Sequence, residues 1–134
     1  MWQENVEIVR GIYALAEQRD ESVWDLVAPG FVFDFSRRLI DPVVLRGRDQ
    51  VRAFAERASE VWEGGYLGWE PEELIDAGDK VLAFIRVSGR GKASGVDVEA
   101  HTWNVWTFRN GEPVELTYFG EDRAEALKAA GLEE

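Results

Sequence analysis

The chain has 134 residues, 46% of them hydrophobic and 12% aromatic, which predicts one packed domain spanning residues 1–134. Its formal net charge of −11 argues against a phosphate-backbone partner and against anionic membranes, so we expect neither nucleic acid nor a membrane as partner. The sequence contains no cysteine, a single histidine and no apolar run of membrane-spanning length, so we expect no disulfide, no bound metal and a cytoplasmic location.

The first half of the chain is predicted to be mainly helical, since its apolar residues recur at helical spacing. The expected elements, in order, are a helix with Asn5 as its N-cap, a short helix begun by Asp20 and ended by Pro29-Gly30, a strand over residues 31–35, a loop over residues 36–48, and a helix that Asp49 caps and Gly64-Gly65 stops.

In the second half the apolar residues alternate, which predicts strands. The expected elements are a strand over residues 66–75 that Pro71 confines to an edge or a bulge, a turn at residues 77–80, strands over residues 81–90, 96–108 and 114–119, a mobile hairpin tip at residues 89–95, a tight turn at Asn110-Gly111, and a helix from Asp122 to Gly131. Helices followed by an antiparallel meander predict the α+β class.

The strand over residues 96–108, VDVEAHTWNVWTF, carries most of the functional argument. Side chains alternate between the two faces of a sheet, so parity divides this strand into two sets. One set comprises Asp97, Glu99, His101, Trp103 and Val105, and the other comprises Val98, Ala100, Thr102, Asn104, Trp106 and Phe108. We expect the second set to face the interior, with Thr102 and Asn104 as its polar groups and His101 on the outer face.

The element order and four segments resemble the SnoaL-like branch of the NTF2-like superfamily. These segments are ENVEIVRGIYAL, LRGRDQVRAF, IDAGDKVLAFIRVSGRGKASGVDVEAHTWNVWTFRNG and DRAEALKAAGL. The resemblance implies a cone, in which a curved, mostly antiparallel sheet wraps around N-terminal helices and encloses an apolar pocket. The superfamily includes ketosteroid isomerases, polyketide cyclases, limonene-epoxide hydrolases, dehydratases and members without activity, so the fold alone does not determine the function.

The resemblance places Asn104 in the pocket, where ketosteroid isomerases have a protonated aspartate. An amide there can donate a hydrogen bond to a developing enolate without any shift of pKa. The alternative is a core asparagine that bonds to a neighbouring group, and the sequence leaves both interpretations open.

A proton-abstracting base is less well defined. The isomerase base aligns with Phe35, and Asp34 lies one position earlier; an inward Asp34 can serve as the base, whereas an outward one is a solvated carboxylate. The isomerase tyrosine similarly aligns with Ile12, and Tyr13 lies beside it. Alternation with Thr117 and Phe119 puts Glu115 on the expected pocket side, although a rim position in water is the alternative.

Two other chemistries are disfavoured. The epoxide hydrolases need an Asp-Arg-Asp set, but Thr117 occupies the last-strand position, and Arg86 lacks its acid because Ser88 stands there. His101 is expected to bond Glu99 or a cross-strand partner on the outer face, which in this family often forms a dimer interface.

We therefore expect a pocket that binds an apolar, carbonyl-bearing or cyclic ligand, with cofactor-free isomerisation or aldol cyclisation as its chemistry and Asn104, Asp34 and Glu115 as catalytic candidates. The alternative is a non-catalytic ligand-binding or dimeric interaction module, and a homodimer is expected through the outer sheet face. The expected ligand-binding residues are Tyr13, Phe33, Phe35, Phe54, Trp62, Phe84, Arg86, Thr102, Trp106, Thr117 and Phe119.

Overall fold

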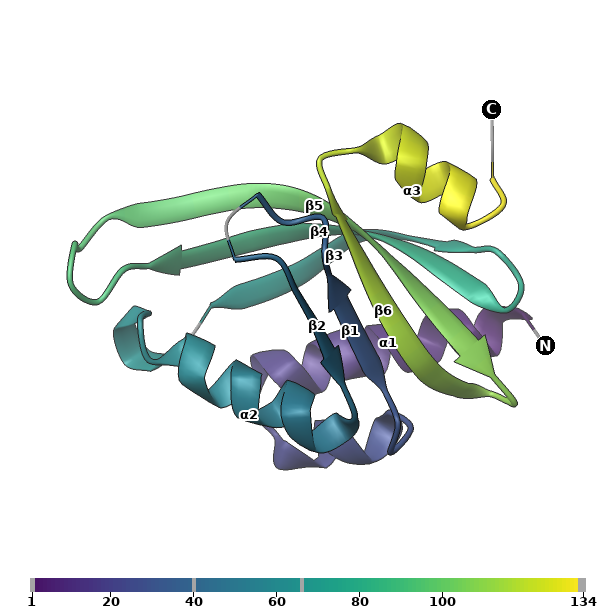
Figure 1. Cartoon of the computed structure of the whole chain (residues 1–134), viewed down its shortest axis with the longest axis horizontal. Helices are drawn as coiled ribbons and strands as arrows, with labels where there is room; N and C mark the ends of the chain where they lie inside the picture. Colours follow the sequence, from purple (N-terminus) through teal and green to yellow (C-terminus); the bar gives the residue numbers. More distant parts are fainter. Residues whose placement is uncertain (1, 40, 66, 133–134) are drawn as a thin grey trace.

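The computed structural model describes residues 2–39, 41–65 and 67–132. Its elements (Figure 1) are α1 (Trp2–Glu17), the 3-10 helix η1 (Glu21–Leu26), β1 (Val32–Phe35), β2 (Val43–Arg46), α2 (Arg48–Ser59), the 3-10 turn η2 (Glu63–Gly65), β3 (Gly68–Asp76), β4 (Lys80–Arg90), β5 (Asp97–Arg109), β6 (Glu112–Gly120) and α3 (Arg123–Ala129). Six strands form one sheet in the order β2-β1-β6-β5-β4-β3, so the α+β class is confirmed.

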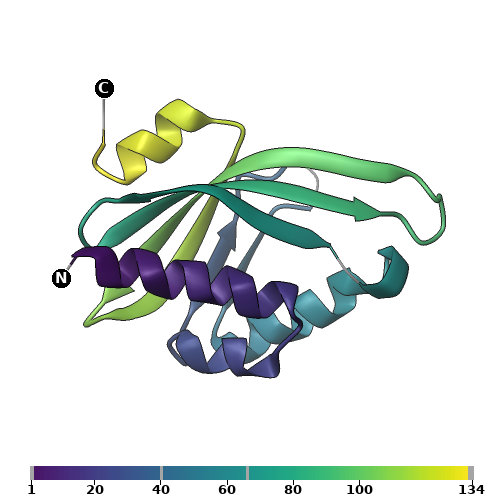
Figure 2. The same ribbon diagram turned by 180° about the vertical axis from the view of Figure 1, so that it is seen from behind.

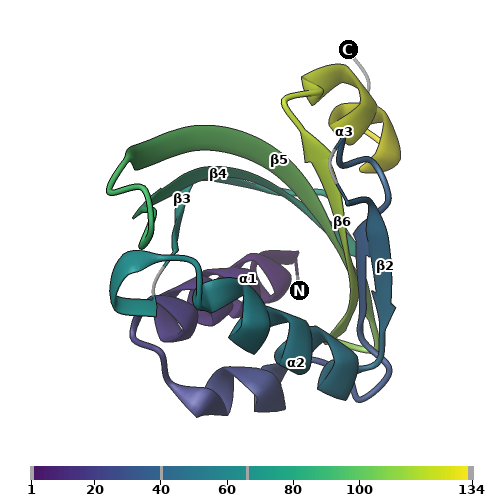
Figure 3. The same cartoon turned by 60° about the vertical axis from the view of Figure 1, so that its left-hand side comes forward.

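The sheet is strongly curved and has helices on both faces. Figure 3 shows α1 and α2 inside its hollow, and Figure 2 shows α3 on the opposite side, above the strands. All strand pairs are antiparallel except β1 with β6, which run parallel; the long connection through α2 and β3–β5 allows this pairing. This arrangement is the cone that the sequence predicts.

Several local predictions are confirmed by the backbone. The Asp20 carboxylate caps η1 by accepting from the Ser22 amide, and the Asp122 carboxylate caps α3 by accepting from the Glu125 amide. Asn110 and Gly111 both have positive φ, of 53° and 76°, as a tight hairpin turn requires. Strand β3 lies at the sheet edge and is bulged between Pro71 and Glu73, since proline cannot donate to the ladder.

Other boundaries differ from the predictions. Asn5 is inside α1, not at its N-cap, and its side-chain amide donates to the Gly78 carbonyl at 3.0 Å, which ties α1 to the β3–β4 turn. The expected loop over residues 36–48 contains β2, whose short apolar run pairs with β1. Gly47, with a φ of 95°, takes the N-cap position of α2, and Asp49 lies in the first helical turn. Tyr66, the expected start of β3, lies outside the described residues.

The ends of α2 and of the β4–β5 hairpin also differ in detail. Helix α2 ends at Ser59, before the glycine pair that was expected to stop it, and both glycines belong to η2. Strand β4 ends at Arg90, as expected, and β5 begins at Asp97, so the connection between them comprises residues 91–96 in place of 89–95. Its turn is tied to the end of α2, because the Lys92 amide donates to the Val61 carbonyl at 2.9 Å.

Two apolar clusters occupy opposite faces of the sheet. The larger one lies on the concave face, where α1 and α2 pack against β1, β4, β5 and β6, with Val9, Val81 and Ile85 fully buried. The smaller one lies on the convex face, where α3 covers Leu82, Trp103 and Val105. The inward set expected on β5 is therefore confirmed for Thr102, Asn104, Trp106 and Phe108, but Trp103 and Val105 are also buried, under α3.

Candidate functional site

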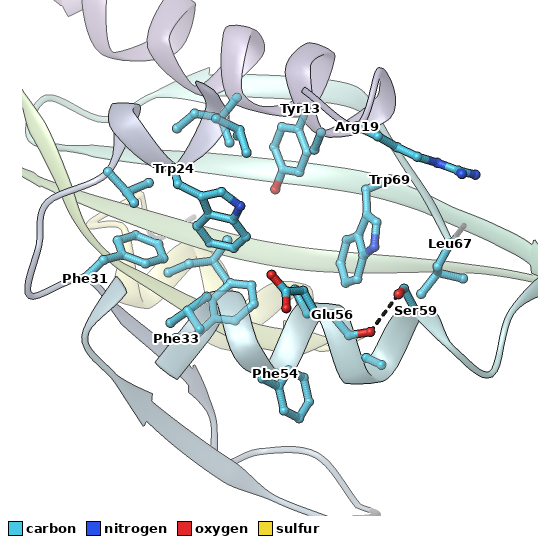
Figure 4. Close-up of a pocket in the computed structure, with 18 of the residues that line it drawn as sticks. Tyr13, Arg19, Trp24, Phe31, Phe33, Phe54, Glu56, Ser59, Leu67 and Trp69 are labelled. Atoms are coloured by element: carbon cyan, nitrogen blue, oxygen red, sulfur yellow. Dashed lines mark hydrogen bonds between the residues drawn. The ribbon is translucent and has the colours of Figure 1, made fainter. Parts of the chain in front are cut away.

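A cavity of about 430 Å³ lies between the concave face of the sheet and the helices α1, η1 and α2. Figure 4 shows Tyr13 of α1, Trp24 of η1 and Trp69 of β3 turned toward it. Of the residues expected to bind a ligand, the cavity is lined by Tyr13, Phe33, Phe35, Phe54, Trp62 and Trp106, and Asn104 also lines it. The volume lies within the range that is typical of small-molecule sites.

Tyr13, Asn104 and Trp106 form a buried hydrogen-bonded cluster in the cavity wall. The Tyr13 hydroxyl accepts from the Asn104 side-chain amide at 3.3 Å and from the Trp106 indole N–H at 3.1 Å. Burial raises the pKa of Tyr13 to about 12, and the two donated hydrogen bonds offset only part of that rise. The hydroxyl therefore stays protonated at neutral pH.

The local structure explains why these three side chains meet. Asn104 and Trp106 are two positions apart on β5, so they share its concave face. Tyr13 is on the buried side of α1, which crosses that face, and its ring meets the Trp106 ring edge-on with centroids 5.6 Å apart. Packing of the two rings thus sets the hydroxyl between the indole and the amide.

Two buried side-chain oxygens have no hydrogen-bond partner in the described residues, Asn104 Oδ1 and Thr102 Oγ1. Asn104 is 1% exposed and lines the cavity, whereas Thr102 does not line it. A buried polar atom without a partner costs free energy, so the Asn104 oxygen is a point where a ligand can compensate.

Asp34 lies outside the cavity lining. Its neighbours in the chain, Phe33 and Phe35, both line the cavity, and their ring centroids are 4.5 Å apart. Asp34 therefore projects from the opposite face of β1. Partial burial raises the pKa of Asp34, but hydrogen bonds from Ser36 and the charges of Arg37 and Arg46 outweigh this effect and hold it below its usual value. Asp34 is thus an ionised surface carboxylate.

The parity expected for β6 is wrong. Leu116 pairs with Trp106 and lines the cavity, so Glu115 and Thr117, on either side of it, belong to the opposite face. Phe119 packs in the cluster beneath α3. The structure therefore does not bring Glu115 or Asp34 to Asn104.

Phe84 and Arg86 also lie on the convex face. The Phe84 ring stacks on His101 with centroids 5.1 Å apart, and His101 Nε2 lies 2.6 Å from a carboxylate oxygen of Glu72. Arg86 forms ion pairs with Glu70 at 3.1 Å and Glu99 at 3.5 Å. The outer position expected for His101 is confirmed by these contacts, although its acidic partner is Glu72 and not Glu99.

Sequence reasoning missed several residues that line the cavity, among them Trp24, Trp69 and Glu56. Trp24 belongs to η1 and Trp69 to the edge strand β3, both far from Asn104 in the chain. Glu56 comes directly after the apolar residues Phe54 and Ala55 in α2. Its carboxylate lies on the cavity side of that helix in Figure 4. Glu56 is exposed and also pairs with Arg52 at 3.3 Å, so it belongs to the cavity mouth.

Within residues 2–39, 41–65 and 67–132, no three acidic, histidine or cysteine side chains cluster in a way that could hold a metal ion. In the same ranges, no helix is both long and apolar enough to cross a membrane.

Comparisons with solved structures identify this fold. An NTF2-like protein from Burkholderia thailandensis E264 matches with a TM-score of 0.76 and 25% identity, over 96% of this chain and 95% of that one. A proposed SnoaL-like polyketide cyclase from Jannaschia sp. CCS1 matches with a TM-score of 0.75 and 23% identity, over 98% and 94%. TerC, co-crystallised with polyporic acid, matches with a TM-score of 0.74 and 20% identity, over 88% and 92%.

A search of curated proteins gave no match. The SnoaL-like domain family matches residues 8–116, which comprise most of the chain and include the C-terminal part of α1, the cavity lining and Asn104. With the cone fold in place as well, the chain belongs to the SnoaL-like domain family.

Proposed function

We propose that the cavity binds a small, largely apolar, cyclic molecule that presents an oxygen atom to Tyr13. The observation that carries this proposal is the direction of the hydrogen bonds at Tyr13. Its oxygen accepts from Asn104 and from Trp106, so its own proton is left to be donated. A carbonyl or other acceptor oxygen of a ligand in the cavity is the natural recipient.

The walls of the cavity support a ring-shaped ligand. Phe33, Phe54, Trp24 and Trp69 come from four different elements and offer aromatic faces and edges around one space (Figure 4). Aromatic pairs stabilise each other beyond the effect of buried area alone, so a flat ligand gains from several walls at once. TerC, a structure of the same fold, was co-crystallised with polyporic acid, and this is compatible with such a ligand.

The proposal is tested by calorimetric titration with 2-acetylnaphthalene, an apolar two-ring ketone. We expect saturable one-to-one binding that Tyr13→Phe weakens about tenfold, since a buried hydrogen bond to the ketone is lost. Tyr118→Phe is the matched control, because Tyr118 packs against the same core but does not line the cavity. Equal affinity for the wild type and Tyr13→Phe would refute the assigned role of Tyr13.

A second candidate function is cofactor-free proton transfer next to the ligand carbonyl, as in isomerisation or aldol cyclisation. It is favoured by Glu56, whose carboxylate lines the cavity, whereas Asp34 and Glu115 do not. In this scheme Glu56 removes a proton from the carbon beside the carbonyl, and Tyr13 donates to the carbonyl oxygen as it gains charge. Asn104 supports Tyr13 through its hydrogen bond.

Proton abstraction is measured directly by NMR, as deuterium exchange from D₂O into the methyl group of 2-acetylnaphthalene. We expect exchange above the buffer rate that Glu56→Gln removes and that Glu60→Gln, an exposed control just after α2, leaves intact. If exchange stays at the buffer rate while the ketone saturates the protein, proton transfer is refuted and the cavity only binds the ligand.

We also propose that the chain forms a homodimer through the outer face of β3–β5, next to the area that α3 covers. This face carries the Phe84–His101 stack and the ion pairs of Arg86. Arg86→Glu is expected to convert a dimer into a monomer in light scattering, while Arg57→Glu on α2 leaves the dimer intact. If light scattering shows that the wild type is a monomer at millimolar concentration, the dimer proposal is refuted.

A further inference from the structure

The Asn104 amide places a requirement on the ligand that Tyr13 alone does not impose. Its nitrogen is committed to Tyr13, but its oxygen, in a side chain that is 1% exposed, has no partner in the described residues. The cavity wall therefore offers a ligand two unused groups close together, the proton of Tyr13 and an acceptor oxygen of Asn104.

A single ligand oxygen can satisfy both groups only if it also carries a hydrogen. Resting on the function proposed above, we infer that the preferred ligand presents a hydroxyl group, as a phenol, an enol or an alcohol, between Tyr13 and Asn104. The hydroxyl oxygen accepts from Tyr13, and its hydrogen is donated to Asn104 Oδ1. A ketone or an ether satisfies Tyr13 but places its lone pairs beside the Asn104 oxygen, which then stays unpaired.

The competing arrangement is a rotated Asn104 amide. Turned by 180°, the amide oxygen accepts the Tyr13 proton and the nitrogen faces the ligand, so the amide offers the ligand a donor and no acceptor. A ligand then needs only an acceptor oxygen at the amide, and a hydroxyl gains nothing there over an ether. The two arrangements thus predict different outcomes, a preference for the hydroxyl in the first and no preference in the second.

Two probes of one skeleton distinguish them, 2-naphthol and 2-methoxynaphthalene. Both offer an oxygen to Tyr13, but only the naphthol can donate to Asn104. In calorimetric titration at neutral pH we expect the naphthol to bind about tenfold more tightly than its methyl ether. Equal affinities, or a preference for the ether, would overturn the inference while leaving the apolar cavity established as a binding site.

Variants assign the preference to the amide. Asn104→Leu is expected to equalise the two affinities, and a preference that survives in this variant would contradict the role of Asn104. Tyr13→Phe weakens both probes but is expected to keep the preference, because the amide oxygen remains. Should Asn104→Leu not fold, Tyr13→Phe and the wild type still decide the outcome. Binding of neither probe nor of 2-acetylnaphthalene would instead refute the proposed function itself, and the inference with it.

Discussion

Replacing Tyr13 with phenylalanine tests the central cluster without any ligand. The substitution keeps the ring, which packs edge-on against Trp106, and removes the oxygen that accepts two hydrogen bonds. A buried donor left without a partner costs about 1–3 kcal/mol. The bond from Asn104 is the longer one, at 3.3 Å, so the Trp106 indole carries most of the cost. We expect a loss of about 2–3 kcal/mol in the free energy of unfolding at pH 7.

The same residue makes the stability depend on alkaline pH. The pKa of Tyr13 is about 12 in the folded chain against a model value of 10.0, so between these values the folded state retains a proton that the unfolded state releases. Stability consequently falls as the pH rises through this window. Two pKa units correspond to about 3 kcal/mol, since each unit is worth about 1.4 kcal/mol. The advantage of the wild type over Tyr13→Phe should therefore vanish near pH 12.

Urea denaturation followed by tryptophan fluorescence measures both effects, with a titration from pH 7 to pH 11.5 for each protein. Tyr118→Phe, which removes a tyrosine hydroxyl outside the cavity, is the control. The m-value should not change, because the same surface is exposed on unfolding. A Tyr13→Phe protein within 0.5 kcal/mol of the wild type at pH 7, or a difference that does not change with pH, would refute the reasoning.

Three further substitutions test the remaining features. Asp34→Asn should leave 2-acetylnaphthalene binding unchanged in calorimetry and should be less stable than the wild type at pH 7 but not at pH 2, because a depressed pKa contributes stability that is lost as the pH falls below 3.8. Gly111→Ala should cost about 1 kcal/mol in urea denaturation because of its positive φ, whereas Gly30→Ala, with open space and no such φ, should be nearly neutral. Leu127→Ala should cost about 2–3 kcal/mol without changing ligand affinity, since Leu127 is on α3 and packs against the convex face of the sheet; a changed affinity would mean that the two sheet faces are coupled.

The α+β class and the inner face of β5 could be predicted from the sequence because they depend on short-range patterns, whereas the cone was implied by the family resemblance. Alternation over thirteen residues assigns Asn104 to one face whatever the exact ends of the strand are. The Asp20 and Asp122 caps and the Asn110-Gly111 turn are equally local, since each depends on the preferences of one or two residues. These features needed no knowledge of the partner strands.

The face of β6 could not be predicted in the same way, because it depends on the pairing with β5. The pairing shifts by one residue between Trp103 and Asn104 and again between Thr107 and Phe108. Each bulge moves every later side chain to the other face relative to a regular ladder. Alternation with Thr117 and Phe119 therefore put Glu115 inside, although Leu116 occupies that place.

Tyr13 shows the corresponding limit for helices. Ile12 and Tyr13 are both 6% exposed, so the buried stripe of α1 is wide enough to include either residue. The pattern alone could not tell which of them reaches Asn104. Only the crossing of α1 over β5 and the packing against the Trp106 ring bring the tyrosine hydroxyl to the amide.

The two faces of β5 also separate stability from ligand chemistry. Trp103 and Val105 pack beneath α3, while Asn104 and Trp106, which alternate with them, face the cavity. A change at Asn104 alters what the cavity can donate and accept but leaves the contacts of α3 in place. The hydrogen-bonding pattern of the wall can thus vary within one fold, which is why the site, and not the cone itself, must determine the ligand.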